Sequence, residues 1–186
     1  MIGNNKFGFI LNKKNDNNLE IKMIIDGVNV MEYSYNGEIR TTTWDSFGFI
    51  DYFVDNLHHI MVDDPYPFES NQRNGIQMTR SSGVAIDWEK IENGDEEELT
   101  KLEECSELLD SWVQKHNWFY YRDAAFIPDV TFRRVNDSIE ISWDNNELFD
   151  EEEVCYVNKE GCVLVDIDLF ESVIKELILE YKKILL

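Results

Sequence analysis

Few residues in this chain have the types and spacing of a metal centre. Three histidines and three cysteines are present, but the sequence contains neither an H-E-x-x-H helix motif nor a C-x-x-C pair, the usual arrangements for zinc. Cys155 and Cys162 are seven residues apart across an expected hairpin, which is not a zinc-knuckle spacing. We therefore predict no metal site and interpret the cysteines as buried thiols, the common environment of a free cysteine.

The arrangements used for nucleophilic catalysis and phosphate binding are also missing from the sequence. It contains no G-x-S-x-G elbow, no Walker-type G-x-x-x-x-G-K and no G-x-G-x-x-G. Cys105 and His116 fall on one expected helix, eleven residues apart. That separation is about 16 Å along the axis, too far for a catalytic dyad. We interpret His116 as a histidine at the edge of the core, and we predict that the chain is not an enzyme and needs no cofactor.

One group of carboxylates has two interpretations. Asp166, Asp168 and Glu171 could hold Mg²⁺ at the junction of a strand and a helix. Alternatively, Asp168 caps the helix and Glu171 completes a capping box. The capping interpretation accounts for two of the three residues without a ligand, and we favour it.

Aromatic and arginine side chains gather in two segments that could contact a partner. Residues 112–121 contain five aromatic residues and precede an arginine, and two further arginines lie in an expected hairpin. Trp, Tyr and Arg are the usual anchors of protein interfaces, although a small core also uses many aromatic residues. The predicted binding residues are Trp118, Tyr120, Tyr121, Arg122, Arg133, Arg134, Trp143 and Asp144.

The elements expected in the first half of the chain are strands followed by a helix. Residues 7–11, 19–25 and 28–35 have strand character, and Asp-Gly and Asn-Gly turn signals favour an antiparallel meander. Apolar residues then recur at helical spacing over residues 44–61. Thr42 or Thr43 is expected to cap this helix, and the prolines that follow residue 64 end it.

In the second half, acidic residues 95–98 are placed to start a helix that ends near residue 118. Residues 129–135 and 138–143 form an expected hairpin, in which Phe132 faces Ile141, Val130 faces Trp143 and Arg133 faces Glu140. A second hairpin is expected from residues 154–157 and 162–165, followed by a helix from Asp168 to the last residue.

These elements predict an α+β fold, in which antiparallel hairpins and a meander pack with about three amphipathic helices. The 186 residues are enough for one well-packed domain. We expect a single domain over residues 1–186, with two lobes of about 1–90 and 95–186 as the alternative.

The charge of the chain limits its partners. Thirty-eight Asp and Glu against 17 Lys and Arg give a formal net charge of −21. That field repels nucleic-acid phosphates and anionic membranes, so we expect no direct nucleic-acid contact and no membrane contact. It suits a basic protein partner, or simply a solvated acidic surface. The N-terminus lacks a signal-peptide pattern, and we expect a cytoplasmic protein; the oligomeric state stays open.

Scattered residues between about 40 and 145 carry a resemblance. They are Trp44, Asp64-Pro65-Tyr66-Pro67, His116, Ala124-Ala125, Pro128, Phe132-Arg133-Arg134 and Ser142-Trp143-Asp144. This pattern resembles uncharacterised bacterial domains found beside ImmA/IrrE-type zinc peptidases and helix-turn-helix regulators. The resemblance implies a role in bacterial stress, mobile-element or phage-conflict systems. Peptidase activity is not implied here, because the H-E-x-x-H motif is missing.

The sequence thus predicts a non-catalytic, acidic protein-binding module of a bacterial or phage conflict system, such as an immunity protein, an antitoxin or an accessory subunit. The alternative is a nucleic-acid mimic that inhibits a DNA- or RNA-processing enzyme, with carboxylates aligned along one elongated face. Acidic residues cluster at 95–98, 103–104 and 147–153. A cryptic metal-dependent enzyme built on Asp166 and Asp168 is the third hypothesis.

Overall fold

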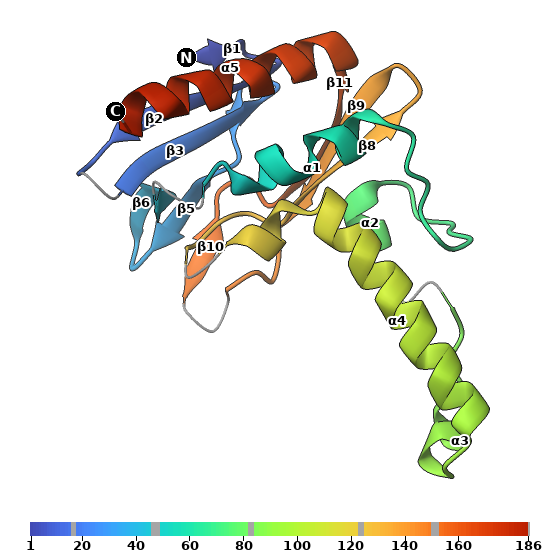
Figure 1. The fold of residues 1–186 in the computed structure, drawn as a ribbon. Coiled ribbons are helices and arrows are strands. Elements are labelled where there is room, and N and C mark those ends of the chain that lie inside the picture. The colour runs from blue at the N-terminus through green and yellow to red at the C-terminus, as the bar shows by residue number, and fades with distance from the viewer. Residues whose placement is uncertain (16–17, 46–48, 82–83, 123–124, 150–152, 186) are drawn as a thin grey trace.

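The computed structural model describes residues 1–15, 18–45, 49–81, 84–122, 125–149 and 153–185. Within these residues it confirms the expected α+β class, with antiparallel strands in three sheets and three helices longer than seven residues. The sheets form a body together with two of these helices. The third, α4 (Glu96–His116), extends away from the body and carries the short α3 (Trp88–Glu92) at its far end (Figure 1).

The first sheet is built from N-terminal strands. The strands β1 (Ile2–Gly3), β2 (Phe7–Lys13), β3 (Asn18–Ile25) and β4 (Val28–Asn29) are neighbours in that order, and β7 (Thr43–Asp45) also pairs with β3. Alternate side chains of β3, beginning at Leu19, point into the core, as the alternating sequence predicted. Helix α5 (Ile167–Leu185) covers this sheet (Figure 1), and its Phe170 ring stacks on Phe7 at a centroid distance of 5.0 Å.

The second sheet contains the hairpin that the sequence predicted. It joins β8 (Val130–Val135) to β9 (Ser138–Asp144), and β11 (Glu160–Asp166) pairs with the other side of β9. The register pairs Phe132 with Ile141 and Arg133 with Glu140, as expected. The short helix α2 (Gly75–Thr79) packs on this sheet, because the Gly75 N–H donates to Glu140 Oε1 at 2.6 Å and the Ile76 N–H donates to Ser142 Oγ at 3.0 Å.

The third sheet corrects two sequence predictions. Residues 154–157 and 162–165 do not pair with each other: β10 (Val154–Tyr156) pairs with β5 (Glu32–Tyr35), which also pairs with β6 (Glu38–Thr41). The strand expected over residues 28–35 is therefore divided between β4 and β5, in different sheets. The physical reason is the packing of side chains, since Val154 and Tyr156 join Tyr33 in a separate small cluster, whereas Val165 of β11 lies in the main core.

The first long helix begins later than expected. Helix α1 spans Asp51–Met61, whereas Trp44 lies in β7 opposite Leu19. Residues 46–48, also part of the predicted helix, lie outside the described part of the chain. Trp44 is buried against the rings of Phe49 and Trp118, so contacts distant in sequence override its helical spacing.

The cap predicted at Thr42 or Thr43 was wrong for the same reason, since Thr43 lies in β7. Thr42 is buried between segments, and its hydroxyl lies 2.6 Å from the carbonyl oxygen of Phe126 and 3.3 Å from that of Met31. The residue at the cap position of α1 is Ile50, whose side chain makes no capping hydrogen bond.

One large core joins residues from both ends of the chain. It includes the inner faces of the first two sheets, the apolar side of α1, and Phe170, Val173, Ile174 and Leu177 of α5. Among the described residues, no helix combines the length and apolar composition needed to cross a bilayer.

Candidate functional site

Two of the predicted binding residues are buried in the core. Trp118 lies in the 3₁₀ helix η1 (Trp118–Tyr121) and packs against the rings of Phe9 and Phe53. Trp143 is also buried, with its ring close to the backbone of Gly161. Neither indole is available at the surface, so part of the aromatic residues predicted to bind a partner belongs to the core.

The two arginines of the β8–β9 hairpin make internal contacts. Arg133 donates from Nε and Nη2 to the two carboxylate oxygens of Glu140, at 2.9 and 2.8 Å, a bidentate ion pair whose carboxylate is buried. Arg134 donates from Nη1 to the carbonyl oxygen of Met61 at 2.9 Å, at the last residue of α1. Both side chains therefore hold elements of the body together.

The remaining predicted residues are closer to solvent. Asp144 accepts from Arg80 at 2.6 Å, and the Tyr121 hydroxyl lies 3.3 Å from an Asp55 carboxylate oxygen. Arg122 lies over the Phe119 ring, 4.4 Å from its centroid. Tyr120 is the most exposed of the eight predicted residues. Of the eight predicted residues, two are therefore buried, two make internal contacts and four lie closer to solvent.

The carboxylates at the start of α5 form a helix cap. Asp166 Oδ1 accepts from the backbone N–H groups of Asp168 and Leu169 at 3.0 and 3.1 Å, so Asp166 and not Asp168 caps the helix. Glu171 instead pairs with Lys175, one turn further along. Over the described part of the chain, no group of three or more His, Cys, Asp or Glu is arranged to hold a metal ion.

The cysteines also differ from expectation. Cys155 and Cys162 are exposed and Cys105 is partly exposed, all as free thiols, so the prediction of buried thiols was wrong. In β11 the alternate residues, including Cys162 and Leu164, face solvent because α2 covers only part of that sheet. In the cluster at 147–153, residues 150–152 lie outside the described part of the chain, as does Ala124 of the resemblance.

The feature that the structure adds is a projecting arm, which we define as residues 84–108. It comprises an extended segment (84–87), α3 and the first thirteen residues of α4 (Figure 1). Beyond the arm, Leu109, Trp112 and Val113 of α4 pack against Met78 and Tyr66 of the body. Among the described residues, none of the three core clusters includes a residue of the arm.

The arm is stabilised by polar contacts at its tip. Asp87 and Asp95 cap α3 and α4, accepting from the backbone N–H groups of Lys90 and Glu98. Glu98 accepts from the Asp87 N–H at 3.0 Å and from Lys101 at 2.9 Å, and these bonds hold the pKa of Glu98 below its ordinary range. Lys101 also donates to the Ala85 carbonyl, which fixes the extended segment beside α4.

The surface of the arm is acidic and partly apolar. Its 25 residues include ten Asp and Glu against two Lys, a large share of the excess negative charge of the chain. Three large apolar side chains on it face solvent: Trp88 is 61% exposed, Leu99 43% and Leu108 54%. Three exposed apolar side chains on one projecting acidic segment make the arm the candidate interaction surface of the chain.

The root of the arm is fixed by a buried histidine, as the sequence analysis expected of His116. Its ring packs on Trp112, and its Nδ1 lies 2.8 Å from the Phe132 carbonyl oxygen, to which it donates. Its Nε2 lies 3.3 Å from Asp64 Oδ2. Burial lowers the pKa of His116, and the Asp64 carboxylate offsets only part of that effect.

Sequence reasoning located the acidic cluster and the helix but not the arm as a site. The available signal was Leu108, which lies off the stripe expected from Leu99, Leu102 and Cys105. That stripe was predicted to be buried, and for Leu99 the prediction was wrong, since its side chain is 43% exposed. Comparison of the chain with protein-family models, curated proteins and solved structures gives no match. The resemblance noted for residues 40–145 therefore stays a prediction, and function is inferred from the residues and their geometry.

Proposed function

We propose that this chain is a non-catalytic protein-binding module that engages a basic partner protein through its acidic arm. The observation that carries the proposal is the arm itself: a projecting segment of 25 residues with ten carboxylates and three exposed apolar side chains, none of them in a core cluster of the described residues. The charge would steer a basic partner into contact, and the apolar side chains would supply affinity at short range.

The proposed role is that of an acidic inhibitor or accessory subunit in the cytoplasm, such as an immunity protein or an antitoxin of a bacterial or phage conflict system. Two features support it. The net charge of −21 suits association with a basic toxin or nuclease. The resemblance of residues 40–145 to domains beside zinc peptidases and regulators implies the same setting.

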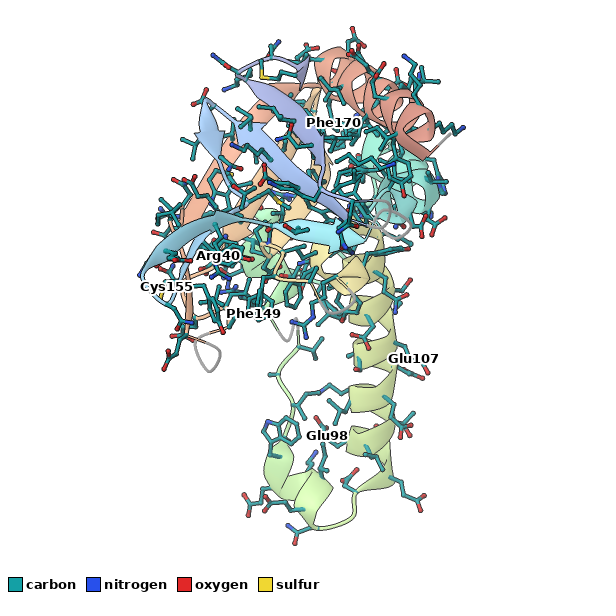
Figure 2. The ribbon with its side chains drawn as sticks, turned by 90° about the vertical axis from the view of Figure 1, so that its left-hand side faces the viewer. Arg40, Glu98, Glu107, Phe149, Cys155 and Phe170 are labelled. Atoms are coloured by element: carbon teal, nitrogen blue, oxygen red, sulfur yellow. The ribbon has the colours of Figure 1, made fainter. Side chains whose placement is uncertain are left out.

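Nucleic-acid mimicry is the second candidate, and one observation favours it. Exposed acidic side chains of α4, Glu107 among them, lie on the side of the arm that faces away from the extended segment, whereas Glu98 points toward that segment (Figure 2). A mimic predicts that duplex DNA or RNA displaces the chain from its captured partner. The exposed leucines favour the protein-binding role, because a surface that imitates nucleic-acid phosphates needs carboxylates and gains nothing from apolar side chains.

The experiment is affinity capture from the native cell by three tagged forms of the full chain. One is the wild type, one is Glu103→Gln with Glu107→Gln, and the matched control is Glu176→Gln with Glu180→Gln on α5. Both double variants remove two carboxylates spaced four residues apart on a helix, so they change the net charge equally.

We expect capture of a basic protein, weakened about tenfold in the arm variant at low salt and little changed in the control. Equal loss in both variants would reduce the effect to overall charge and contradict the arm as the contact. Capture of an acidic protein would contradict the proposed partner chemistry.

A further inference from the structure

The exposed side of α4 within the arm has a regular organisation. Leu99 and Leu108 are nine residues apart, which is two and a half helical turns, so they lie on opposite edges of the helix and about 14 Å apart along its axis. Both are exposed. The side of the helix between these two edges carries five exposed carboxylates and no cation: Glu96, Glu97, Glu103, Glu104 and Glu107.

The other side of the helix is already covered in part. Glu98 is buried, and Lys101, Leu102 and Cys105 are partly buried, toward the extended segment 84–87. Figure 2 shows the two sides, with Glu98 turned toward that segment and Glu107 turned to open solvent. The free surface of the arm is therefore a ridge, with a crest of carboxylates and a leucine at each edge.

A flat partner surface does not fit this ridge. Two leucines on opposite edges of one helix cannot both contact the same plane, and a plane that touched one edge would leave the other exposed. A groove that encloses half of a helix contacts both edges and the crest together. The floor of such a groove would need cations, because it lies opposite five carboxylates of the helix that would otherwise be desolvated without partners.

We propose that the ridge formed by residues 96–108 inserts into a groove of a basic protein, with Lys and Arg along the groove floor and apolar side chains on both walls. This inference rests on the proposed function and deepens it by giving the shape and chemistry of the partner. The groove accepts one helix, about 10–12 Å across with its side chains. Recognition is the helix-in-groove mode, with anchors on both edges instead of one.

The test is site-specific photocrosslinking in the native cell, using the full chain. Photoreactive benzoylphenylalanine is placed in separate variants at residue 99, at residue 108, and at residue 179 of α5. Leu179 is 59% exposed, similar to Leu99 and Leu108, and so provides a matched control on a helix outside the arm.

We expect residues 99 and 108 to crosslink to the same basic polypeptide and residue 179 to give no crosslink to it. Crosslinks from one edge alone would overturn the groove and leave a flat contact through the arm, so the proposed function would survive. Crosslinks from residue 179 alone, or none at all, would overturn the groove and the proposed function together.

A second measurement tests the leucines as anchors on the captured partner. Leu99→Ser and Leu108→Ser are each expected to raise Kd about tenfold, and the double variant about a hundredfold, because separate walls hold the two side chains. Leu179→Ser is the control and should leave Kd unchanged. An effect of Leu99→Ser with none of Leu108→Ser, or the reverse, would contradict contact at both edges.

Discussion

Replacement of Arg133 by Met is expected to destabilise the body without affecting partner binding. The variant removes two charge-assisted hydrogen bonds, from Nε and Nη2 of Arg133 to the Glu140 carboxylate, at 2.9 and 2.8 Å. Among the described residues, the Gly75 N–H, at 2.6 Å, is then the hydrogen-bond donor that remains to Glu140. The buried carboxylate has lost its cationic partner.

The magnitude follows from the burial of the pair. Breaking a fully buried ion pair by removing one partner costs about 3–5 kcal/mol. Here the Glu140 side chain is 6% exposed but the Arg133 side chain is 20% exposed, so solvent screens part of the interaction. We therefore expect a loss of about 3 kcal/mol in the free energy of unfolding for Arg133→Met, at the lower end of that range.

Urea unfolding of a double-mutant cycle measures this. Glu140→Gln alone is expected to cost about 2 kcal/mol, and the double variant about 3 kcal/mol, less than the two single losses together, because the partners interact directly. The control is Arg40→Met, since the Arg40–Glu38 pair is exposed on both sides and should contribute about 0–1 kcal/mol. A loss below about 1 kcal/mol for Arg133→Met, together with weakened partner capture, would refute the structural role and restore Arg133 as an interface residue.

Three further predictions address the body and the arm. Gly161→Ala should destabilise the chain by about 1–3 kcal/mol in urea unfolding, because an added Cβ would lie 2.2 Å from the buried Trp143 ring; Cys162→Ala, on the exposed face, is the control, and equal stability of the two variants would contradict this packing. Because burial lowers the pKa of His116, the histidine of the unfolded chain is protonated first on acidification. The contribution of neutral His116 to the stability of the fold is therefore complete above about pH 6.5 and falls as the pH drops toward the folded-state pKa. Thermal unfolding from pH 8 to 5 should show this fall in the wild type and less of it in His116→Gln, and parallel profiles of the two proteins would contradict it. In the free chain, amide hydrogens of residues 96–108 should exchange faster than those of α5, since the arm adds nothing to a core cluster; equal protection of the two helices would contradict that account.

The parts of the fold that the sequence predicted depend on local signals. The β8–β9 hairpin was found with its register because two alternating strands flank a two-residue turn, and this places Phe132 opposite Ile141 without further information. Helix α4 was found because acidic residues mark its first turn and Asp95 caps it. In both cases the residues that decide the structure are close together in the chain.

The errors occur where distant contacts decide the structure. Trp44 has the spacing of a helix residue, but pairing with Leu19 and packing against Trp118 place it in a strand. Trp118 and Trp143 are of the residue type that often anchors interfaces, but both are buried in the core. Burial of an aromatic residue depends on which segments meet it, and residue type alone does not show this.

The arm was missed for a related reason. The sequence predicts one side of α4 to be buried along the helix, through a stripe of residues at helical spacing: Leu99, Leu102, Cys105, Leu109, Trp112 and His116. Among the described residues, the body supplies core partners for the end of this stripe, at Leu109 and Trp112, and no core cluster includes Leu99, Leu102 or Cys105. How far the body extends along α4 is decided by the assembled fold, and the spacing of apolar residues within the helix does not show it.

Hydrogen–deuterium exchange of the chain alone and bound to its captured partner shows whether the arm is the contact surface. Binding through the arm should slow exchange at residues 96–108 and leave α5 and the first sheet unchanged. Protection of the segment around Tyr120, or of a sheet, with the arm exchanging as fast as in the free chain, would contradict it.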